Sequence, residues 1–367
     1  MHQERKIIHV DMDSFYASIE MRDHPAYRQV PLVIARDPRH ANGKGVVATA
    51  NYIARQYGVH SAMSCAQALK LCPQAVFKRP DFDKYRQVSE QIHAIFRQYT
   101  DIIEPIALDE AYLDVTENKL NECSAIKLAH DLQQKIYAKT QLTCSVGISY
   151  NKFLAKLSSE YRKPMGLTVV RKEEAQAFLL ALPIQDFRGV GKKTLPRMHE
   201  LGIFSGQDLY NCSLKKLQQH FGKMGFILYQ RVRGEDNRVV QATRKRKSLG
   251  KERTFDTPLC SQEEVEEQLK RLAQKVTTQM QKKQKQGQTL VLKVRNSRYQ
   301  TMTKRLTQRD FFTNDVATLV FYSLQLFEQI QPENIDVRLL GLTLTGLDDA
   351  SYQNIVLPLW QNENEMK

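Results

Sequence analysis

The sequence predicts an α+β protein in which a β-α-β-β-α-β order of elements occurs twice. Short apolar or alternating runs mark the strands, and apolar residues at helical spacing mark the helices. A long insertion at 17–78 interrupts the front copy after its first strand and is expected to form a small domain of its own. The elements of the front copy lie at 7–12, 83–99, 102–108, 111–115, 124–138 and 143–149, and we expect ferredoxin-like topology in both copies.

The rear copy follows a basic linker, TRKRKS at 243–248. Ser261 and Glu264 form a capping box at the start of a predicted helix. The segment TLVLKVRN alternates between apolar and basic side chains, as a strand covered on one face does. The elements of this copy are expected at 248–255, 261–284, 289–296, 301–307, 315–330 and 337–347.

The charge of the chain indicates a polyanionic partner. It carries 54 Lys+Arg against 40 Asp+Glu, a formal net charge of +14. Residues 241–310 hold 18 Lys+Arg and 7 Asp+Glu, which is most of the surplus. Nucleic acid ranks ahead of a membrane as the partner. The net charge alone, however, is equally consistent with a basic protein that does not bind DNA.

Other features of the sequence predict a cytoplasmic protein. No apolar stretch reaches the roughly 18 residues that a membrane span needs, and the N-terminal MHQERKII lacks a signal-peptide core. The six cysteines form no CxxC pair and have no zinc-ligand spacing. We interpret them as small buried hydrophobic residues in a reducing compartment.

Carboxylates stand at the ends of two apolar strands. Asp11 ends the first strand, and Asp109 and Glu110 stand at the crest of the central hairpin, whose strand can lie beside the first. Three clustered carboxylates repel one another unless a cation holds them. With no His or Cys expected beside them, these oxygen ligands favour two Mg²⁺ ions, the usual device for phosphoryl displacement. An ordinary exposed turn is the alternative, and Asp13 and Asp114 are assigned to solvent, capping or supporting roles.

Five motifs, in order along nearly the whole chain, resemble those of the Y-family DNA polymerases. They are HVDMDSFYASIE, VVATANYIARQYGV, LDEAYLDVT, SVGISYNKFLAKLSSEYRKPMG and RGVGKKTLPRMHELGI. The resemblance implies a right-hand polymerase whose thumb contains a helix-hairpin-helix motif. Its implied domains are a palm at 1–16 and 79–167, fingers at 17–78, a thumb at 168–240, a little finger at 241–347 and a C-terminal tail at 348–367.

The resemblance also assigns roles at the active site. Two Mg²⁺ ions, for which Mn²⁺ is a possible substitute, would be held by Asp11, Asp109, Glu110 and the backbone carbonyl of Met12. Tyr16 would be the steric gate that excludes a ribose hydroxyl; taken alone it could equally be a core aromatic. The residues implied to contact the nucleotide are Phe15, Tyr16, Thr49, Tyr52, Arg55 and Lys163.

Further residues are expected to bind macromolecules. Gly189, Gly191, Lys192 and Lys193 form a glycine turn ahead of a helix, which can present backbone N–H groups to DNA phosphates, and 221–234 is a weaker second copy. The little-finger residues expected to face duplex DNA are Lys293, Arg295, Arg298, Lys304 and Arg305. The tail residues Gln353, Leu357 and Leu359 resemble a sliding-clamp peptide, with a final strand as the alternative.

The sequence therefore predicts a monomeric, template-directed, error-prone DNA polymerase for lesion bypass. Its partners would be primer-template DNA, a dNTP and the sliding clamp, with no membrane, and nothing in the chain resembles a proofreading exonuclease domain. A magnesium-dependent nuclease, which also uses paired carboxylates, and a non-catalytic DNA-binding or clamp-recruiting scaffold are the alternatives.

Overall fold

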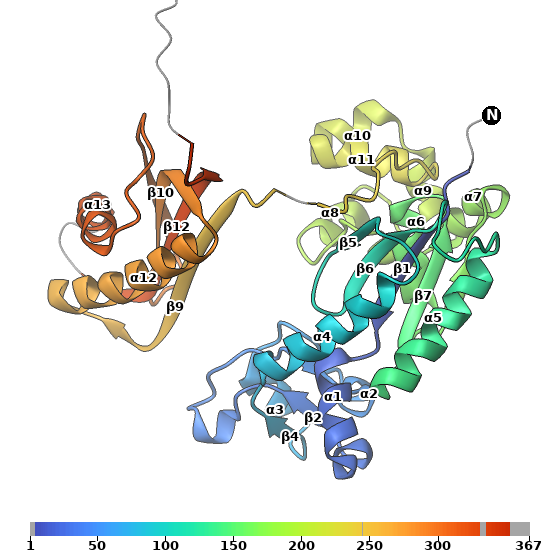
Figure 1. The fold of residues 1–367 in the computed structure, drawn as a ribbon, viewed down its shortest axis with the longest axis horizontal. Coiled ribbons are helices and arrows are strands. Elements are labelled where there is room, and N and C mark those ends of the chain that lie inside the picture. Colours follow the sequence, from blue (N-terminus) through green and yellow to red (C-terminus); the bar gives the residue numbers. More distant parts are fainter. Residues whose placement is uncertain (1–3, 244, 331–334, 353–367) are drawn as a thin grey trace, which may run out of the picture. The chain divides into compact units, whose positions relative to one another are not determined.

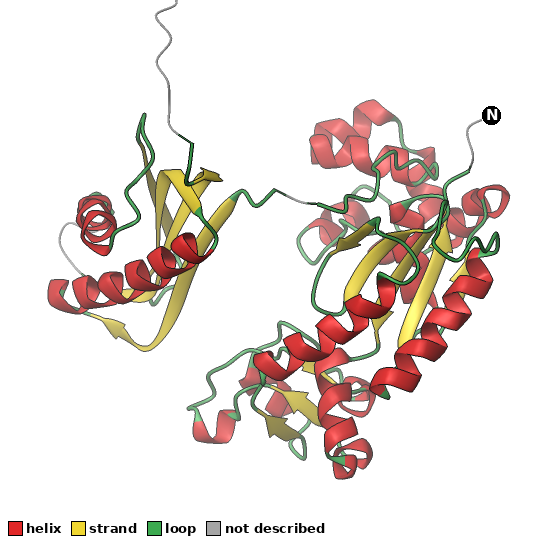
Figure 2. Ribbon diagram, viewed as in Figure 1, coloured by secondary structure: helices red, strands yellow, loops and turns green. Residues whose placement is uncertain are grey.

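A computed structural model describes residues 4–243, 245–330 and 335–352. The chain divides into two compact units, 1–243 and 244–367. Sheets and helices occur in both units, as Figure 2 shows, so the α+β prediction is confirmed. None of the helices in the described ranges is long and apolar enough to cross a bilayer.

The first unit is built on a five-stranded sheet in the order β5-β6-β1-β7-β8. Its strand β1 is buried along its whole length and pairs antiparallel with both β6 and β7 (Figure 1). The hairpin strand β6 thus lies beside the first strand, which is the ferredoxin-like order that the sequence predicts. The strands are β1 (Ile7–Met12), β5 (Ile103–Pro105), β6 (Glu110–Asp114), β7 (Cys144–Ser149) and β8 (Leu167–Val169).

The two faces of this sheet are covered differently. Helices α4 (Phe82–Phe96) and α5 (Ala125–Thr140) bury one face in the largest hydrophobic core of the unit. Helix α6 (Lys152–Tyr161) packs on the opposite face against β7 and β1. It comes so close that a Cβ on Gly147 would lie 2.0 Å from the carbonyl oxygen of Ala155, so only glycine fits there. This approach brings α6 over the face that carries the odd-numbered residues of β1.

The insertion folds around a core of its own. A small sheet, β3-β2-β4, and two short helices enclose buried residues such as Val33, Val47 and Ala68. Helix α1 (Phe15–Asp23) instead packs into the main core through Ala17 and Ile19. The remaining elements are β2 (Leu32–Ile34), β3 (Thr49–Ala50), β4 (Val76–Lys78), α2 (Tyr52–Gln56), α3 (Cys65–Leu71), and the 3₁₀ turns Pro25–Gln29 and Pro38–His40.

A helical segment with its own core completes the first unit. Its first glycine turn follows a single 3₁₀ turn, Ile184–Asp186, and precedes helix α8. The second glycine turn, at Gly222, lies between two α-helices as predicted. The helices are α7 (Lys172–Ala181), α8 (Thr194–Glu200), α9 (Gly206–Asn211), α10 (Leu214–Phe221) and α11 (Lys223–Arg231).

The second unit has the predicted element order, but the expectation that it also has ferredoxin-like topology is wrong. Its sheet runs β11-β10-β12-β9. The last strand, β12, therefore lies between β9 and β10, whereas in a ferredoxin-like sheet the hairpin strand β11 would lie there. Both helices contribute to its hydrophobic core, and the Ser261–Glu264 capping box forms. The elements are β9 (Ser248–Leu259), α12 (Gln262–Lys282), β10 (Lys285–Arg295), β11 (Thr301–Thr307), α13 (Val316–Glu328) and β12 (Val337–Asp349).

The cysteines are only partly where we expect them. Cys65, Cys72, Cys144 and Cys212 are buried, as predicted. The expectation is wrong for Cys123 and Cys260, which are exposed. Both stand just before a helix N-cap serine, where the chain runs at the surface.

Candidate functional site

Strand register brings the three predicted carboxylates together. Asp11 and Glu110 are direct partners in the antiparallel pair of β1 and β6, so both side chains point to the same face of the sheet. The amide of Met12 donates to the carbonyl oxygen of Asp109 at 2.9 Å, which fixes Asp109 at the end of the pairing. Residues almost one hundred positions apart thus form a single acidic cluster.

Two lysines neutralise this cluster. The Lys163 ammonium lies 2.6 Å from Asp11 Oδ1. The Lys156 ammonium contacts Glu110 and lies 3.9 Å from Asp11 Oδ2 and 3.3 Å from Glu160 Oε1. Within the described ranges, no group of three or more His, Cys, Asp or Glu side chains is arranged to hold a metal ion as it stands. The lysine contacts give the physical reason, because Asp11 and Glu110 are each turned toward an ammonium group.

Neighbouring charges give the adjacent carboxylates opposite pKa shifts. Burial, followed by repulsion from Asp11 and Glu110, raises the pKa of Asp109 to about 6. Burial alone would also raise the pKa of Glu110, but His9 and Lys156 outweigh it and lower that pKa to about 2. Asp109 is therefore the carboxylate of the cluster whose charge is least compensated by the protein itself.

A buried histidine lies directly behind the cluster. His9 is fully buried on β1, and its Nε2 lies 3.4 Å from Glu110 Oε2. Its Nδ1 is hydrogen-bonded to Ser159 Oγ at 2.8 Å, which ties the ring to α6. Burial holds the pKa of His9 below its usual value. The expectation that no histidine lies near the carboxylates is wrong, because alternation along β1 places His9 on the same face as Asp11.

The donor set fits hard divalent cations. Carboxylate oxygens of Asp11, Asp109 and Glu110 and the backbone carbonyl of Met12 are the ligands that Mg²⁺ or Mn²⁺ prefers, and three carboxylates supply more negative charge than the two lysines cancel. Metal binding would require both ammonium groups to withdraw from the carboxylates that they contact.

A pocket of about 240 Å³ opens beside the carboxylates. Its lining includes most of the residues expected to contact a nucleotide, namely Phe15, Tyr16, Thr49, Arg55 and Lys163, together with Asp11, Met12 and Asp109. Glu110 is turned away from it toward Lys156. Tyr52 does not line the pocket, but its ring centroid lies 5.0 Å from the Arg55 guanidinium. Burial raises the pKa of the Tyr52 hydroxyl to about 12.

Tyr16 lines this pocket with its ring firmly supported. The ring stacks on Tyr85, with centroids 4.5 Å apart, and meets Phe82 edge-on at 5.8 Å. The Tyr85 hydroxyl donates to the buried Glu20 at 2.9 Å, so the support is itself anchored. Phe15, in contrast, is only 2% exposed and packs in the main core.

Asp13 organises the turn that carries Lys163. Its buried carboxylate accepts hydrogen bonds from the Thr143 and Ser145 hydroxyls and from the amide of Met165. These bonds join β1 and β7 to the segment that follows α6, and so hold Lys163 near Asp11. Asp114 accepts from the amide and hydroxyl of Thr116 in the turn after β6.

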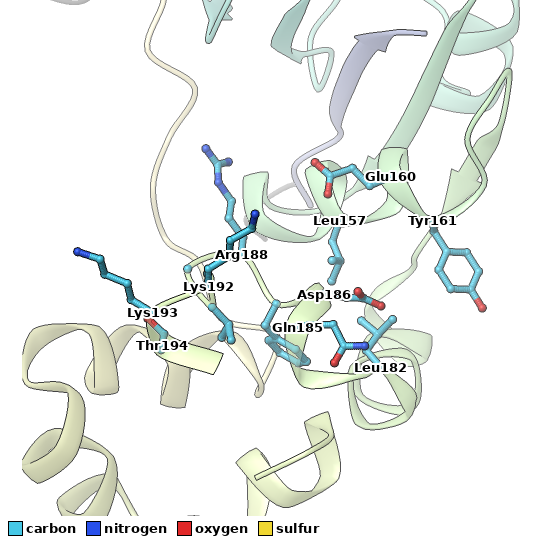
Figure 3. Close-up of a pocket in the computed structure, with 14 residues that line it drawn as sticks. Leu157, Glu160, Tyr161, Leu182, Gln185, Asp186, Arg188, Lys192, Lys193 and Thr194 are labelled. Carbon is cyan, nitrogen blue, oxygen red and sulfur yellow. The ribbon is translucent and has the colours of Figure 1, made fainter. Parts of the chain in front are cut away.

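A larger pocket, of about 950 Å³, lies between α6 and the first glycine turn. Figure 3 shows Glu160 on α6 facing the turn that carries Arg188, Lys192 and Lys193. A Cβ on Gly191 would meet no atom within 4 Å, so space for a ligand remains beside its backbone. Gly189 adopts a φ of +104°, which favours glycine.

Arg188 joins this turn to the five-stranded sheet through Tyr112 on β6, a contact that sequence reasoning missed. Its guanidinium donates to the Tyr112 hydroxyl at 2.7 Å, and its carbonyl accepts from Arg231 at 2.7 Å. The Tyr112 ring lies 4.8 Å from that of His9. No local sequence pattern signals these contacts, because the partners lie 43 and 76 positions from Arg188 along the chain.

The basic residues of the second unit do not share one surface. Cross-strand pairing puts Lys293, Arg295 and Arg305 on one face of the sheet, while Lys304 pairs with the core residue Leu292 and lies on the other face. Because Lys304 and Arg305 are consecutive on a strand, their side chains point to opposite faces of the sheet. Contact of either residue with DNA stays a prediction. Arg298 is exposed in the β10–β11 hairpin loop. Gln353, Leu357 and Leu359 lie outside the described residues.

Comparisons with known proteins agree with this geometry. The model of the impB/mucB/samB family matches residues 10–160, that of its C-terminal domain matches 246–357, and a DNA polymerase-iota thumb domain matches 185–236. The chain is 47% identical to DNA polymerase IV of Streptococcus pyogenes serotype M3, over 94% of both chains. It is 49% identical to DNA polymerase IV of Streptococcus thermophilus, over 96% of both chains.

A solved structure is also similar over most of the chain. It is a Y-family DNA polymerase chimera of Dbh and Dpo4, with a TM-score of 0.82, 28% identity, and coverage of 93% of this chain and 98% of that one. The element order, the acidic cluster and these relatives point to one family. The chain belongs to the Y family of DNA polymerases.

Proposed function

We propose that this chain is a template-directed DNA polymerase of the translesion type, which adds dNTPs to a primer 3′-hydroxyl and has no proofreading exonuclease. One observation carries the proposal. The register of β1 and β6 joins Asp11, Asp109 and Glu110 beside a pocket that Tyr16, Thr49, Arg55 and Lys163 also line. Acidic ligands and phosphate-binding cations thus meet at one place.

The reaction joins the primer 3′-oxygen to the α-phosphorus of the dNTP and breaks the bond to pyrophosphate. Two Mg²⁺ ions, or Mn²⁺ as a substitute, would lower the pKa of the 3′-hydroxyl and offset charge on the phosphates. Asp11, Asp109, Glu110 and the Met12 carbonyl would hold them. The protein's own contribution is mainly positioning and charge neutralisation.

Side chains around the pocket would bind the nucleotide. Arg55 can grip a phosphate through its planar guanidinium, while Lys163 acts as a mobile point charge. Thr49 lines the pocket and would contact the nucleotide directly, and Tyr52, whose ring lies beside the Arg55 guanidinium, would complete the set. The Tyr16 ring, which lines the pocket and stacks on Tyr85, would act as the steric gate that excludes a 2′-hydroxyl and so selects deoxyribose.

The remaining roles extend this proposal to the whole chain. We assign the palm to 1–16 and 79–167, the fingers to 17–78, the thumb to 168–240 and the little finger to 241–347. The first glycine turn and the open-face residues Lys293, Arg295 and Arg305 would grip primer-template DNA without reading its sequence. Residues 348–367 would recruit the sliding clamp to a monomeric enzyme in the bacterial cytoplasm.

A primer-extension assay tests the proposal against a nuclease. Labelled primer on a longer template is incubated with Mg²⁺ and each dNTP in turn. Extension by the templated nucleotide supports the polymerase, and shortening of the primer supports the nuclease. Asp109→Ala is the matched control, since activity that survives this change would come from a contaminant and not from the acidic cluster.

A further inference from the structure

The hairpin between β10 and β11 presents an exposed aromatic ring in an unusual backbone conformation. Pairing of the two strands ends at Arg295 and Thr301, which leaves a five-residue loop at 296–300. Tyr299 in this loop has a φ of +62° and is 65% exposed. A bulky side chain in the left-handed region is a genuine outlier, and it persists only where the surroundings enforce it.

Hydrogen bonds enforce this conformation. Within the loop, the backbone N–H of Asn296 donates to the Gln300 carbonyl oxygen, and the Asn296 carbonyl oxygen accepts from the backbone N–H of Tyr299. The Asn296 side chain donates to the Gln300 side chain and accepts from the Gln300 backbone N–H. Outside it, Ser297 donates through its amide and hydroxyl to Asp336. These hydrogen bonds fix the backbone of the loop, while the Tyr299 side chain remains mostly exposed to solvent.

A second irregularity places a cation beside the same ring. The register between β12 and β9 shifts between Val337 and Leu339, so Arg338 stands at a break in the pairing. Such irregularities re-aim side chains. The Arg338 guanidinium lies 4.8 Å from the Tyr299 ring centroid. An aromatic in left-handed backbone and an arginine at a register break thus converge at one point.

Packing does not account for this arrangement. A ring that is 65% exposed recovers little apolar burial, while left-handed backbone costs roughly 1–2 kcal/mol. Arg295 immediately precedes the loop and Arg298 lies within it, in the part of the chain that holds most of the excess positive charge. An exposed ring among arginines is the combination by which proteins bind single-stranded nucleic acid, with bases stacked on the ring and phosphates near the cations.

We propose that Tyr299, with Arg338 beside its ring, is a stacking platform for an unpaired base of single-stranded DNA. This inference rests on the proposed function, since a polymerase copies an unpaired template strand. It differs from the proposed backbone contacts of Lys293, Arg295 and Arg305, because stacking requires an accessible base face, which the interior base pairs of a duplex do not offer.

The test uses the full chain and a mixed-sequence single-stranded oligonucleotide containing 2-aminopurine, with a blunt duplex of the same sequence beside it. Tyr299→Gly removes the ring and suits the left-handed backbone, and Tyr299→Phe keeps the ring. Phe321→Ala is the matched control, since Phe321 is a comparably exposed aromatic (55%) on helix α13. Binding is measured by anisotropy, stacking by 2-aminopurine quenching, and folding by the melting temperature.

We expect Tyr299→Gly to weaken single-strand binding about 5- to 150-fold and to lose the quenching. Duplex affinity and melting temperature should not fall, and Tyr299→Phe and Phe321→Ala should behave like wild type. Unchanged single-strand affinity would overturn the inference. So would an equal loss of duplex affinity, which means a backbone contact, or a parallel loss of melting temperature, which means a structural ring.

Primer extension by wild type separates this inference from the proposed function. If wild type extends a primer and Tyr299→Gly binds single strands normally, only the stacking platform is wrong. If wild type extends nothing while Tyr299→Gly still loses single-strand binding and quenching, the platform stands and the polymerase assignment fails.

Discussion

Replacing Asp109 with Asn tests the electrostatics of the acidic cluster. The pKa of Asp109 rises from an ordinary 3.8 to about 6, because the folded protein buries its charge near Asp11 and Glu110. Each pKa unit corresponds to about 1.4 kcal/mol, so ionised Asp109 destabilises the metal-free protein by about 3 kcal/mol at pH 7. We therefore expect Asp109→Asn to stabilise the metal-free protein while abolishing primer extension.

The pH dependence follows from the direction of the shift. Above pH 6, Asp109 is ionised in both the folded and the unfolded protein, and the full penalty applies. Between pH 6 and about 4 the folded protein takes up a proton that the unfolded protein does not, so the penalty shrinks as the pH falls. The advantage of Asp109→Asn should therefore be large at pH 7.5 and nearly absent at pH 4.

The neighbouring residue provides a control of opposite sign. His9 and Lys156 lower the pKa of Glu110 from 4.5 to about 2, so its charge stabilises the folded protein by an amount of similar size. Glu110→Gln should thus destabilise the metal-free protein above about pH 4.5, and this difference should fade as the pH drops through the range from 4.5 to 2.

Calorimetric melting in EDTA at several pH values measures both effects. For a unit of this size, about 3 kcal/mol corresponds to a change in melting temperature of roughly 5–10 °C. Added Mg²⁺ should stabilise wild type more than Asp109→Asn and so narrow the gap between them. If Asp109→Asn and Glu110→Gln change the melting temperature in the same direction, the assignment of opposite charge environments to these two residues is wrong.

Four further predictions concern nucleotide and DNA binding. Tyr16→Ala should raise ribonucleotide incorporation, and an unchanged dNTP/rNTP preference in single-nucleotide extension would contradict the gate. Lys163→Met should raise the KM for dNTP roughly 10- to 100-fold through loss of a charged phosphate contact, whereas an effect on kcat alone would point to another role. Combined Lys192→Gln and Lys193→Gln should lower the slope of log affinity against log salt by about 2 for duplex DNA; a constant slope means that they touch no phosphate. Deleting 352–367 should reduce clamp-stimulated synthesis and spare basal synthesis, and equal loss of both would indicate a folding role.

The sequence predicts the element order well because local patterns encode it. Apolar runs and helical spacing place the strands and helices of both sheets to within a few residues. Strand β8 and the strand order of the second sheet are not predictable in this way, since pairing partners are chosen by long-range packing. Strand register places Lys304 on the face of the sheet that carries the core residue Leu292. The presence of basic residues in the sequence does not reveal on which face each one lies.

The carboxylates of the site are predictable, but their partners are not. Asp11, Asp109 and Glu110 stand at the ends of apolar strands, a position that the sequence displays directly. Lys156 and Ser159 lie on α6, and this helix comes close enough to contact the carboxylates and His9 because Gly147 lets its backbone approach the sheet. In the sequence, Gly147 is a single glycine in a predicted strand, and no neighbouring residue indicates that a helix packs against it.

Lys163 contacts Asp11 in the structure and has a proposed role in nucleotide binding, and its ammonium group cannot do both at once. Its ammonium lies 2.6 Å from Asp11, and it also lines the pocket where a triphosphate would bind. A triphosphate offers more negative charge than one carboxylate, so an arriving nucleotide would draw Lys163 away and free Asp11 for a cation. Nucleotide binding and metal binding are then coupled through one side chain, because the protein's own cation must leave before a divalent ion can take its place.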